Sequence, residues 1–153
     1  MTSSLPADVL AFLSRPNHCV MASLRADGSP HTTATWYGLD DDGTIVLNME
    51  AGRRRLVWLE NDPRIALTCI DPDNFYRHVS LTGTVVALEP DPDLRAIDRL
   101  SQHYTGAPYP RRAHRRVTVR IRIDSWHGWD RRPDDRIVSS PLPVLPWGPD
   151  KQL

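Results

Sequence analysis

The most regular pattern of hydrophobic and polar positions lies late in the chain, in residues 116–125. Val117, Val119, Ile121 and Ile123 alternate there with polar residues, and a period of two is typical of a strand with one buried face and one face in water. Shorter runs rich in Val, Ile, Thr and aromatic residues, bounded by turn residues, indicate further strands. We predict strands over residues 18–24, 31–38, 44–49, 64–70, 79–88 and 116–125.

Helical spacing occurs in three segments between or before these strands. It is clearest over residues 90–104, where Leu94, Ile97, Leu100 and Tyr104 recur at the period of an amphipathic helix. Shorter helices are expected over residues 6–13 and 52–61. Because most strands are joined by hairpin turns and the helices are inserts, the pattern predicts a mainly β fold: a small six-stranded antiparallel barrel with flanking short helices.

The composition indicates one folded domain and a tail. Residues 1–130 hold every predicted element, whereas residues 131–153 are rich in Pro, Asp, Ser and Gly and are expected to be an extended tail. Within the domain, Gly83 interrupts a long strand and is expected to mark a bulge or a tight corner of the barrel.

Charge and cysteine content exclude several classes of function. The chain of 153 residues carries 19 Lys and Arg against 19 Asp and Glu, so it lacks the basic excess of a general nucleic-acid binder, and any anion site must be local. Cys19 and Cys69 form no CxxC pair, and the histidines show no ligand spacing, so no metal site is predicted. Neither a signal peptide nor an apolar run of about 20 residues is evident, and we expect a cytoplasmic protein without a membrane partner.

The sharpest local feature is a run of three arginines, Arg53, Arg54 and Arg55, where a strand is followed by a predicted helix. Positive side chains oppose the dipole at a helix N-terminus, which favours anions. Backbone N–H groups and guanidinium groups at one place would suit a phosphate. A solvated charge run, or pairing with nearby acids such as Glu50, remains the alternative.

A second feature is the strand segment Thr33, Ala34, Thr35 and Trp36. Small and hydroxyl-bearing side chains leave a shallow wall against which a flat ring could lie, with polar groups for its edge. The alternative is ordinary β-propensity, since Thr and Trp favour strands in any case.

The order of these motifs resembles that of the pyridoxamine 5′-phosphate oxidase-like superfamily of split β-barrel flavin and deazaflavin proteins, and more closely its actinobacterial branch of F420-dependent oxidoreductases. The resemblance covers residues 5–129. It is carried by Val20-Met21-Ala22-Ser23-Leu24, Gly28-Ser29-Pro30-His31, Thr35-Trp36-Tyr37, Gly52-Arg53-Arg54-Arg55, Asn61-Asp62-Pro63-Arg64, residues 79–83 and Tyr104-Thr105-Gly106.

The resemblance implies a homodimer with two sites for coenzyme F420, or alternatively FMN, at the subunit interface. It assigns the phosphate to Arg53, Arg54 and Arg55, where Arg54 replaces the lysine that the family often has. The other residues that it implies line the cofactor are Thr33, Ala34, Thr35, Trp36, Asn48, Met49 and His78, with Trp126 and Trp129 closing the site from the partner chain.

The chemistry that the resemblance implies is transfer of a hydride from reduced deazaflavin to a small conjugated acceptor, such as a tetrapyrrole or a quinone-like molecule. Tyr37, His78 or solvent could supply the accompanying proton. The alternatives are an FMN-dependent oxidase or reductase of the same fold, and a non-catalytic carrier of the cofactor. Pyridoxamine phosphate oxidation itself is not expected, because Trp126-His127-Gly128-Trp129 stands where that activity needs an Arg-x-His motif.

Overall fold

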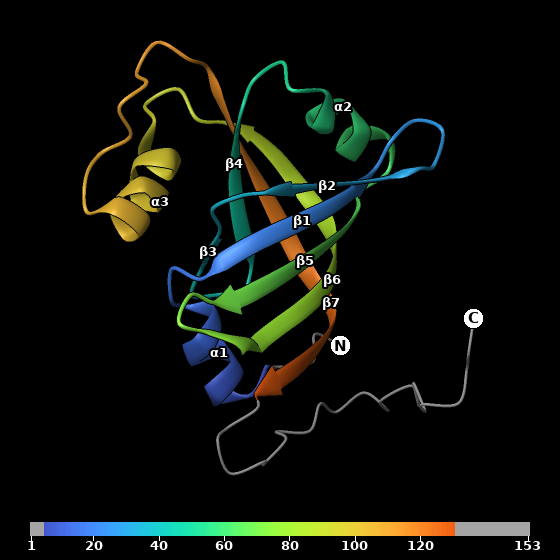
Figure 1. The fold of residues 1–153 in the computed structure, drawn as a ribbon. Helices are drawn as coiled ribbons and strands as arrows, with labels where there is room; N and C mark the ends of the chain where they lie inside the picture. The colour runs from blue at the N-terminus through green and yellow to red at the C-terminus, as the bar shows by residue number, and fades with distance from the viewer. Residues whose placement is uncertain (1–4, 131–153) are drawn as a thin grey trace.

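The chain forms one antiparallel sheet that curls into a barrel (Figure 1), as seen in a computed structural model that describes residues 5–130. The strand order is β2-β1-β5-β6-β7-β4-β3, and every neighbouring pair is antiparallel. The strands are β1 (His18–Leu24), β2 (Pro30–Ala34), β3 (Gly38–Leu39), β4 (Ile45–Glu50), β5 (Arg64–Asp71), β6 (Asn74–Pro90) and β7 (Arg116–Asp130).

The predicted class is confirmed, but the sheet has seven strands instead of six. The difference arises because the strand expected over residues 31–38 is broken into β2 and β3 at residues 35–37. These two strands are the outermost strands of the sheet. The two edges of the sheet are therefore joined by a short covalent segment, and in the described part of the chain β2 and β3 do not pair with each other.

Three helices lie at the two ends of the barrel: α1 (Ala7–Leu13) at one end, and α2 (Arg54–Asn61) and α3 (Arg95–Thr105) at the other (Figure 1). Helix α3 begins later than the predicted residue 90. Leu94 has a φ of 59°, in the left-handed region, so the helix cannot extend back through it. The N–H groups of Ala96 and Ile97 instead donate hydrogen bonds to the carboxylate of Asp91.

The hydrophobic core lies inside the barrel, and helix α3 packs as a second layer on the outer face of β3 and β4. Strand β4 is buried on both faces: Leu47 and Met49 belong to the core cluster. Val46, which points the other way, pairs with Gly38 of β3, and Leu100 of α3 packs there. A Cβ at Gly38 would lie 3.0 Å from Leu100 Cδ2, so the absent side chain lets α3 approach the sheet.

Gly83 marks a bulge, as predicted. The pairing of β6 with β7 shifts register between Thr82 and Gly83, and a Cβ at Gly83 would lie 2.6 Å from the carbonyl oxygen of Arg122. Only glycine permits this approach of two backbones, which bends the long β6–β7 ribbon around the barrel.

Several other expectations can be compared with the structure. Cys19 and Cys69 are buried free cysteines on paired positions of β1 and β5, with their Sγ atoms 3.8 Å apart. None of the described helices is long and apolar enough to cross a membrane. Within residues 5–130, no group of three or more His, Cys, Asp or Glu side chains is placed to hold a metal ion. The expected tail, residues 131–153, lies outside the described residues.

Candidate functional site

A cavity of about 690 Å³ opens beside α3, at the break between β2 and β3. We call it the α3 cavity. Four of the residues predicted to contact the cofactor lie in its wall: Ala34, Thr35, Trp36 and Asn48. The break positions two of them, because residues 35–37 leave the strand geometry and pass across the mouth of the barrel. The rest of the wall consists of Asn17, His18, Cys19, Val20, Ile97, Leu100, Tyr104, Thr105, Tyr109 and Arg116.

Aromatic rings form one side of the α3 cavity. The ring of Trp36 stacks on Tyr104 of α3, with centroids 5.3 Å apart and planes 13° from parallel, and meets Tyr109 edge-on at 6.5 Å. The Tyr104 hydroxyl donates to the backbone oxygen of Asn17 at 2.7 Å. Burial raises the pKa of Tyr104, so its hydroxyl stays uncharged. The Tyr104 ring is held by the stacking on Trp36 and by the hydrogen bond to Asn17 O.

Polar contacts fix the part of the α3 cavity wall that adjoins Tyr109. Asn48 donates from Nδ2 to Asp91 Oδ2 at 3.0 Å and to Thr118 Oγ1 at 3.3 Å, and its Oδ1 accepts from Arg116 Nε at 2.7 Å. The side chain of Asn48 is thus fully used within the protein. It was predicted to line the cofactor site, and it does lie in the wall, but its polar atoms orient Arg116 and Asp91.

Two predicted site residues lie in the core instead. Met49 is 3% exposed and packs in the barrel interior, because it alternates with Asn48 along β4 and faces the other way. Tyr37 is fully buried; its hydroxyl donates to the carbonyl of Arg15 at 3.2 Å and accepts from Asn17 Nδ2 at 2.9 Å. Burial raises the pKa of Tyr37. Met49 and Tyr37 therefore face the core and not the α3 cavity; their expected roles as floor of the site and as proton donor stay predictions.

One polar atom in this region has no partner. Asn17 Oδ1 is buried without a hydrogen bond within the described chain, although Asn17 Nδ2 donates to Phe12 O at 2.7 Å. Asn17 belongs to the wall of the α3 cavity. Buried acceptors of this kind are rare in folded proteins and usually find a donor.

The arginine run lies at the N-terminus of α2, outside the α3 cavity. Arg53 is the N-cap residue; no side chain caps the helix, and its first turn contains no acid. Arg53 forms an ion pair with Glu50 at 3.0 Å, and Glu50 also contacts His114 Nδ1 at 2.8 Å. Arg54 is exposed and Arg55 is half-buried; burial and the charge of Arg53 lower the pKa of Arg55. The first turn thus gathers positive charge around the N–H groups of Arg54 and Arg55, since the next one, that of Leu56, donates to Arg53 O at 3.0 Å.

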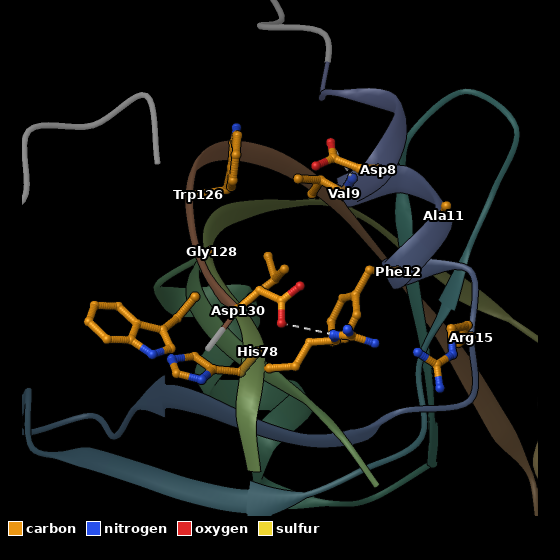
Figure 2. Close-up of a pocket in the computed structure, with 12 residues that line it drawn as sticks. Asp8, Val9, Ala11, Phe12, Arg15, His78, Trp126, Gly128 and Asp130 are labelled. Carbon is orange, nitrogen blue, oxygen red and sulfur yellow. Dashed lines mark hydrogen bonds and ion pairs between the residues drawn. The ribbon is translucent and has the colours of Figure 1, made fainter. Parts of the chain in front are cut away.

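Three further predicted residues line a second, smaller cavity of about 330 Å³ between α1 and the paired ends of β6 and β7 (Figure 2). We call it the α1 cavity. The three residues are His78, Trp126 and Trp129, and Trp129 of β7 pairs with His78 of β6. Burial lowers the pKa of His78, which favours a neutral imidazole near neutral pH. Thr33 belongs to neither cavity wall and is half-exposed on β2.

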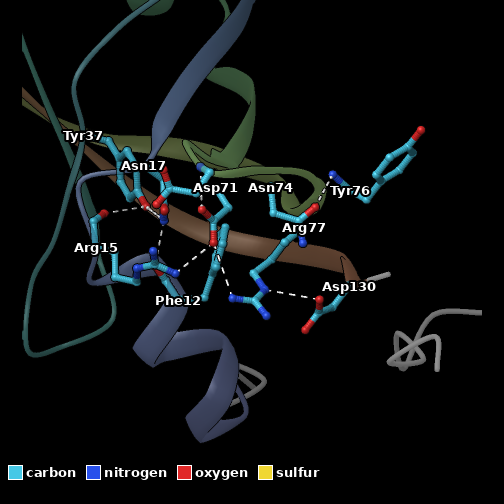
Figure 3. A network of polar contacts seen from close by, with 10 residues as sticks. Phe12, Arg15, Asn17, Tyr37, Asp71, Asn74, Tyr76, Arg77 and Asp130 are labelled. Carbon is cyan, nitrogen blue, oxygen red and sulfur yellow. Dashed lines mark hydrogen bonds and ion pairs between the residues drawn. The ribbon is translucent and has the colours of Figure 1, made fainter. Parts of the chain in front are cut away.

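An ionic network holds the α1 cavity together (Figure 3). The carboxylate of Asp71 is 3% exposed and pairs with Arg15 at 3.0 Å and with Arg77 at 3.5 Å; Arg77 also reaches Asp130 at 3.2 Å. Burial alone would raise the pKa of Asp71, but the N–H of Asp73 and the two guanidinium groups lower it overall. The network joins the end of α1, the β5–β6 turn and the end of β7.

Comparison with known protein families shows which family the chain belongs to. The family model described as pyridoxamine 5′-phosphate oxidase matches residues 5–130, the same residues that form the barrel. The chain belongs to this family. The expected resemblance is thereby confirmed, and the split-barrel fold with it.

Two of the proteins to which the chain is similar are named as reductases. The chain is 30% identical over 125 residues to the F420H(2)-dependent biliverdin reductase of Mycobacterium tuberculosis, covering 80% of this chain and 87% of that protein. A solved structure of an F420 reductase is 28% identical and has a TM-score of 0.71, covering 80% of this chain and 98% of that one. A conserved hypothetical protein of Mycobacterium tuberculosis, Rv2991, is 27% identical with a TM-score of 0.67, covering 84% and 86%. These matches support an enzyme with reductase activity.

Sequence reasoning missed the residues that shape the α3 cavity from α3 and the loop after it. Tyr109 and Arg116 carry no local signal: Tyr109 follows a proline in a loop, and Arg116 is one of several arginines that precede or enter β7. Tyr104 was recognised as a helix residue, but its stacking on Trp36 depends on contacts between segments far apart in the chain.

Proposed function

We propose that this chain is an F420-dependent oxidoreductase that transfers a hydride to a small conjugated acceptor, such as a tetrapyrrole or a quinone-like molecule. The observation that carries the proposal is the uncapped, arginine-rich N-terminus of α2. The names of the two reductase relatives support the choice of cofactor.

The donor set of this chain fits a phosphorylated, ring-bearing cofactor. The N-terminus of α2 offers guanidinium groups from Arg53 to Arg55 and the first-turn N–H groups of Arg54 and Arg55, the combination that binds phosphate in other folds. In the wall of the α3 cavity, Ala34, Thr35 and Trp36 supply the small and flat surface that a ring needs. When bound, a reduced deazaflavin would supply a hydride to an electron-poor double bond.

The protein's own residues would then bind and orient the reacting molecules. We assign phosphate binding to Arg53, Arg54 and Arg55, and orientation of the ring to Thr33, Ala34, Thr35 and Trp36. The α3 cavity offers about 690 Å³ for the ring and the acceptor. With Tyr37 buried in the core, the proton comes from His78 or from solvent. His78 would donate only from its imidazolium form, which is the minor form near neutral pH because burial lowers its pKa.

We also propose a homodimer, because one chain does not bring all these residues together. Ala34, Thr35 and Trp36 border the α3 cavity, whereas His78 and Trp126 line the α1 cavity. In a dimer, the second copy would supply His78 and Trp126 to the first copy's cofactor. Co-expression of two differently tagged variants tests this: one lacks the arginines at 53–55 and the other carries Trp126→Ala. Each variant alone should be inactive, and the mixed dimer should recover one working site.

A binding panel of F420, FMN and FAD tests the cofactor assignment. Wild-type protein should quench the fluorescence of added F420, and the Arg53→Ala/Arg54→Ala/Arg55→Ala variant should bind it more weakly by at least about 1–2 kcal/mol, the cost of lost charged hydrogen bonds. The matched control removes three exposed arginines that pair locally with acids, Arg64, Arg95 and Arg122. Unchanged affinity in the first variant, or equal losses in both, contradicts the phosphate site. Tight FMN binding with a flavin absorbance band would favour FMN instead.

A further inference from the structure

Arg116 is a half-buried arginine in the wall of the α3 cavity that no carboxylate neutralises. Its Nε donates to Asn48 Oδ1 at 2.7 Å, its Nη2 to the Asn48 carbonyl at 3.2 Å and its Nη1 to the Tyr109 hydroxyl at 3.2 Å. All these acceptors are uncharged. Within residues 5–130, no Asp or Glu lies within ion-pair distance of Arg116. The backbone N–H of Asp91 donates to Arg116 O at 2.9 Å, but the Asp91 carboxylate is linked to the guanidinium group only through the side chain of Asn48.

Two other arginines of the sheet do have carboxylate partners. Arg77 pairs with Asp71 and Asp130, and Arg120 pairs with Asp40 and Glu89. A charge that is partly removed from water needs compensation, either from an acid in the protein or from a ligand. At Arg116 the protein supplies neutral acceptors only. Its positive charge is therefore available to an anionic ligand in the α3 cavity.

The setting of Arg116 also limits the shape of what can bind. The guanidinium carbon lies 4.7 Å from the ring centroid of Tyr109, and Tyr109 meets Trp36 edge-on. Trp36 in turn stacks on Tyr104. A cavity of about 690 Å³ with this aromatic side suits a flat, conjugated molecule. Asn48, Tyr109 and the aromatic stack hold the arginine in place before a ligand arrives, which reduces the entropy lost on binding.

We propose that Arg116 binds a carboxylate of a planar, conjugated acceptor in the α3 cavity, and so makes the enzyme selective for anionic acceptors. The inference rests on the proposed reductase function and specifies its substrate class. An acidic oxygen on the cofactor itself could offer the same chemistry, and the experiment below separates the two sources. Formation of the contact involves no covalent step.

The test compares two probes that differ in charge but share a conjugated skeleton: biliverdin, with its two carboxylates, and biliverdin dimethyl ester. Their dissociation constants are measured by equilibrium dialysis without any cofactor, on wild type, Arg116→Gln and Arg115→Gln. Arg115 is the matched control, because it is exposed, is adjacent in sequence and lies outside the α3 cavity wall. F420 binding by each protein is titrated separately, so loss of the proposed cofactor site would be recognised independently.

Wild type should bind the acid more tightly than the ester. Arg116→Gln should weaken binding of the acid by roughly tenfold or more, the range for a charged hydrogen-bonded pair, and leave the ester unchanged. Arg115→Gln should resemble wild type. Because Arg116→Gln could disturb Asn48, a measurement without substitution is included: raising salt should weaken wild-type binding of the acid but not of the ester.

Three results would overturn the proposal. One is a wild-type protein that does not prefer the acid, including one that binds neither probe. A second is an acid-to-ester ratio that is the same in Arg116→Gln and wild type, or that falls equally in Arg115→Gln. The third is a variant that loses affinity for F420 and keeps its affinity for biliverdin, which would assign Arg116 to the cofactor.

Discussion

Asp91 ties helix α3 to the barrel, and its replacement by alanine should loosen both the helix and the α3 cavity. The carboxylate is 7% exposed and accepts three hydrogen bonds: from the N–H groups of Ala96 and Ile97 at 3.2 and 3.0 Å, and from Asn48 Nδ2 at 3.0 Å. Asp91 thus acts as the cap of α3, whose N-cap residue Leu94 offers no side-chain hydrogen bond.

The size of the effect follows from these bonds. Loss of a capping side chain costs about 0.5–2 kcal/mol, and loss of the hydrogen bond to Asn48 costs about 1 kcal/mol more, since Thr118 still accepts from the same amide. The free energy of unfolding of Asp91→Ala should therefore fall by about 1.5–3 kcal/mol. In a domain of this size such a loss lowers Tm by roughly 6–12 °C.

Thermal unfolding followed by circular dichroism, with urea unfolding as a second measure, checks this value. Asp93→Ala is the control, because Asp93 lies in the same loop, is 70% exposed and forms a 3.8 Å ion pair with Arg95; its Tm should change by less than about 2 °C. A drop for Asp91→Ala no larger than that of the control would refute the capping role.

Three further predictions concern the bulge, the acid limb of stability and the proton source. Gly83→Ala should lower the free energy of unfolding by about 2–3 kcal/mol, because the new Cβ would meet the backbone of Arg122. Gly128→Ala should cost less, because its Cβ would meet the ring edge of Trp126 at 3.3 Å. Urea unfolding measures both variants. The lowered pKa of Asp71 means that its stabilisation is present above about pH 4 and is lost as the pH falls through the folded-state pKa, so Asp71→Asn should flatten the acid limb of a Tm-against-pH curve. Tyr37→Phe should lower stability by about 1–2 kcal/mol and leave the rate of acceptor reduction per folded enzyme unchanged.

Each of these has a clear contrary result. Equal stability of the two glycine variants would mean that the backbones at the bulge separate easily. An acid limb as steep in Asp71→Asn as in wild type would place the titrating group elsewhere. A large fall in the rate of Tyr37→Phe, with stability unchanged, would restore Tyr37 as a proton donor.

The fold was largely predictable because it depends on local patterns. Alternation over residues 116–125 and the turn residues between strands identified the sheet, and Gly83 identified its bulge. The break at residues 35–37 was not predictable, since Thr, Trp and Tyr all favour strands. Only the closing of the sheet into a barrel forces the chain to leave one edge and enter the other.

The candidate site was predictable where a run of residues carries it, and not where distant segments meet. Ala34, Thr35 and Trp36 form one stretch and do share a cavity. Met49 faces the core because neighbouring positions of β4 point to opposite sides, and one position of error exchanges core for wall. Tyr37 lies outside any strand, at the break between β2 and β3, and its ring is buried in the core. Arg116 was missed because its lack of an acidic partner is a property of the folded chain and not of its neighbours in sequence.

The segment at residues 35–37 acts as a tether of fixed length between the two margins of the sheet. Its three side chains face different surroundings: Thr35 and Trp36 the α3 cavity, and Tyr37 the interior. Adding or removing residues there would change the aperture between the margins. It would also displace Tyr37, which belongs to the core, so the size of molecule that the protein admits is coupled to the packing of the barrel interior.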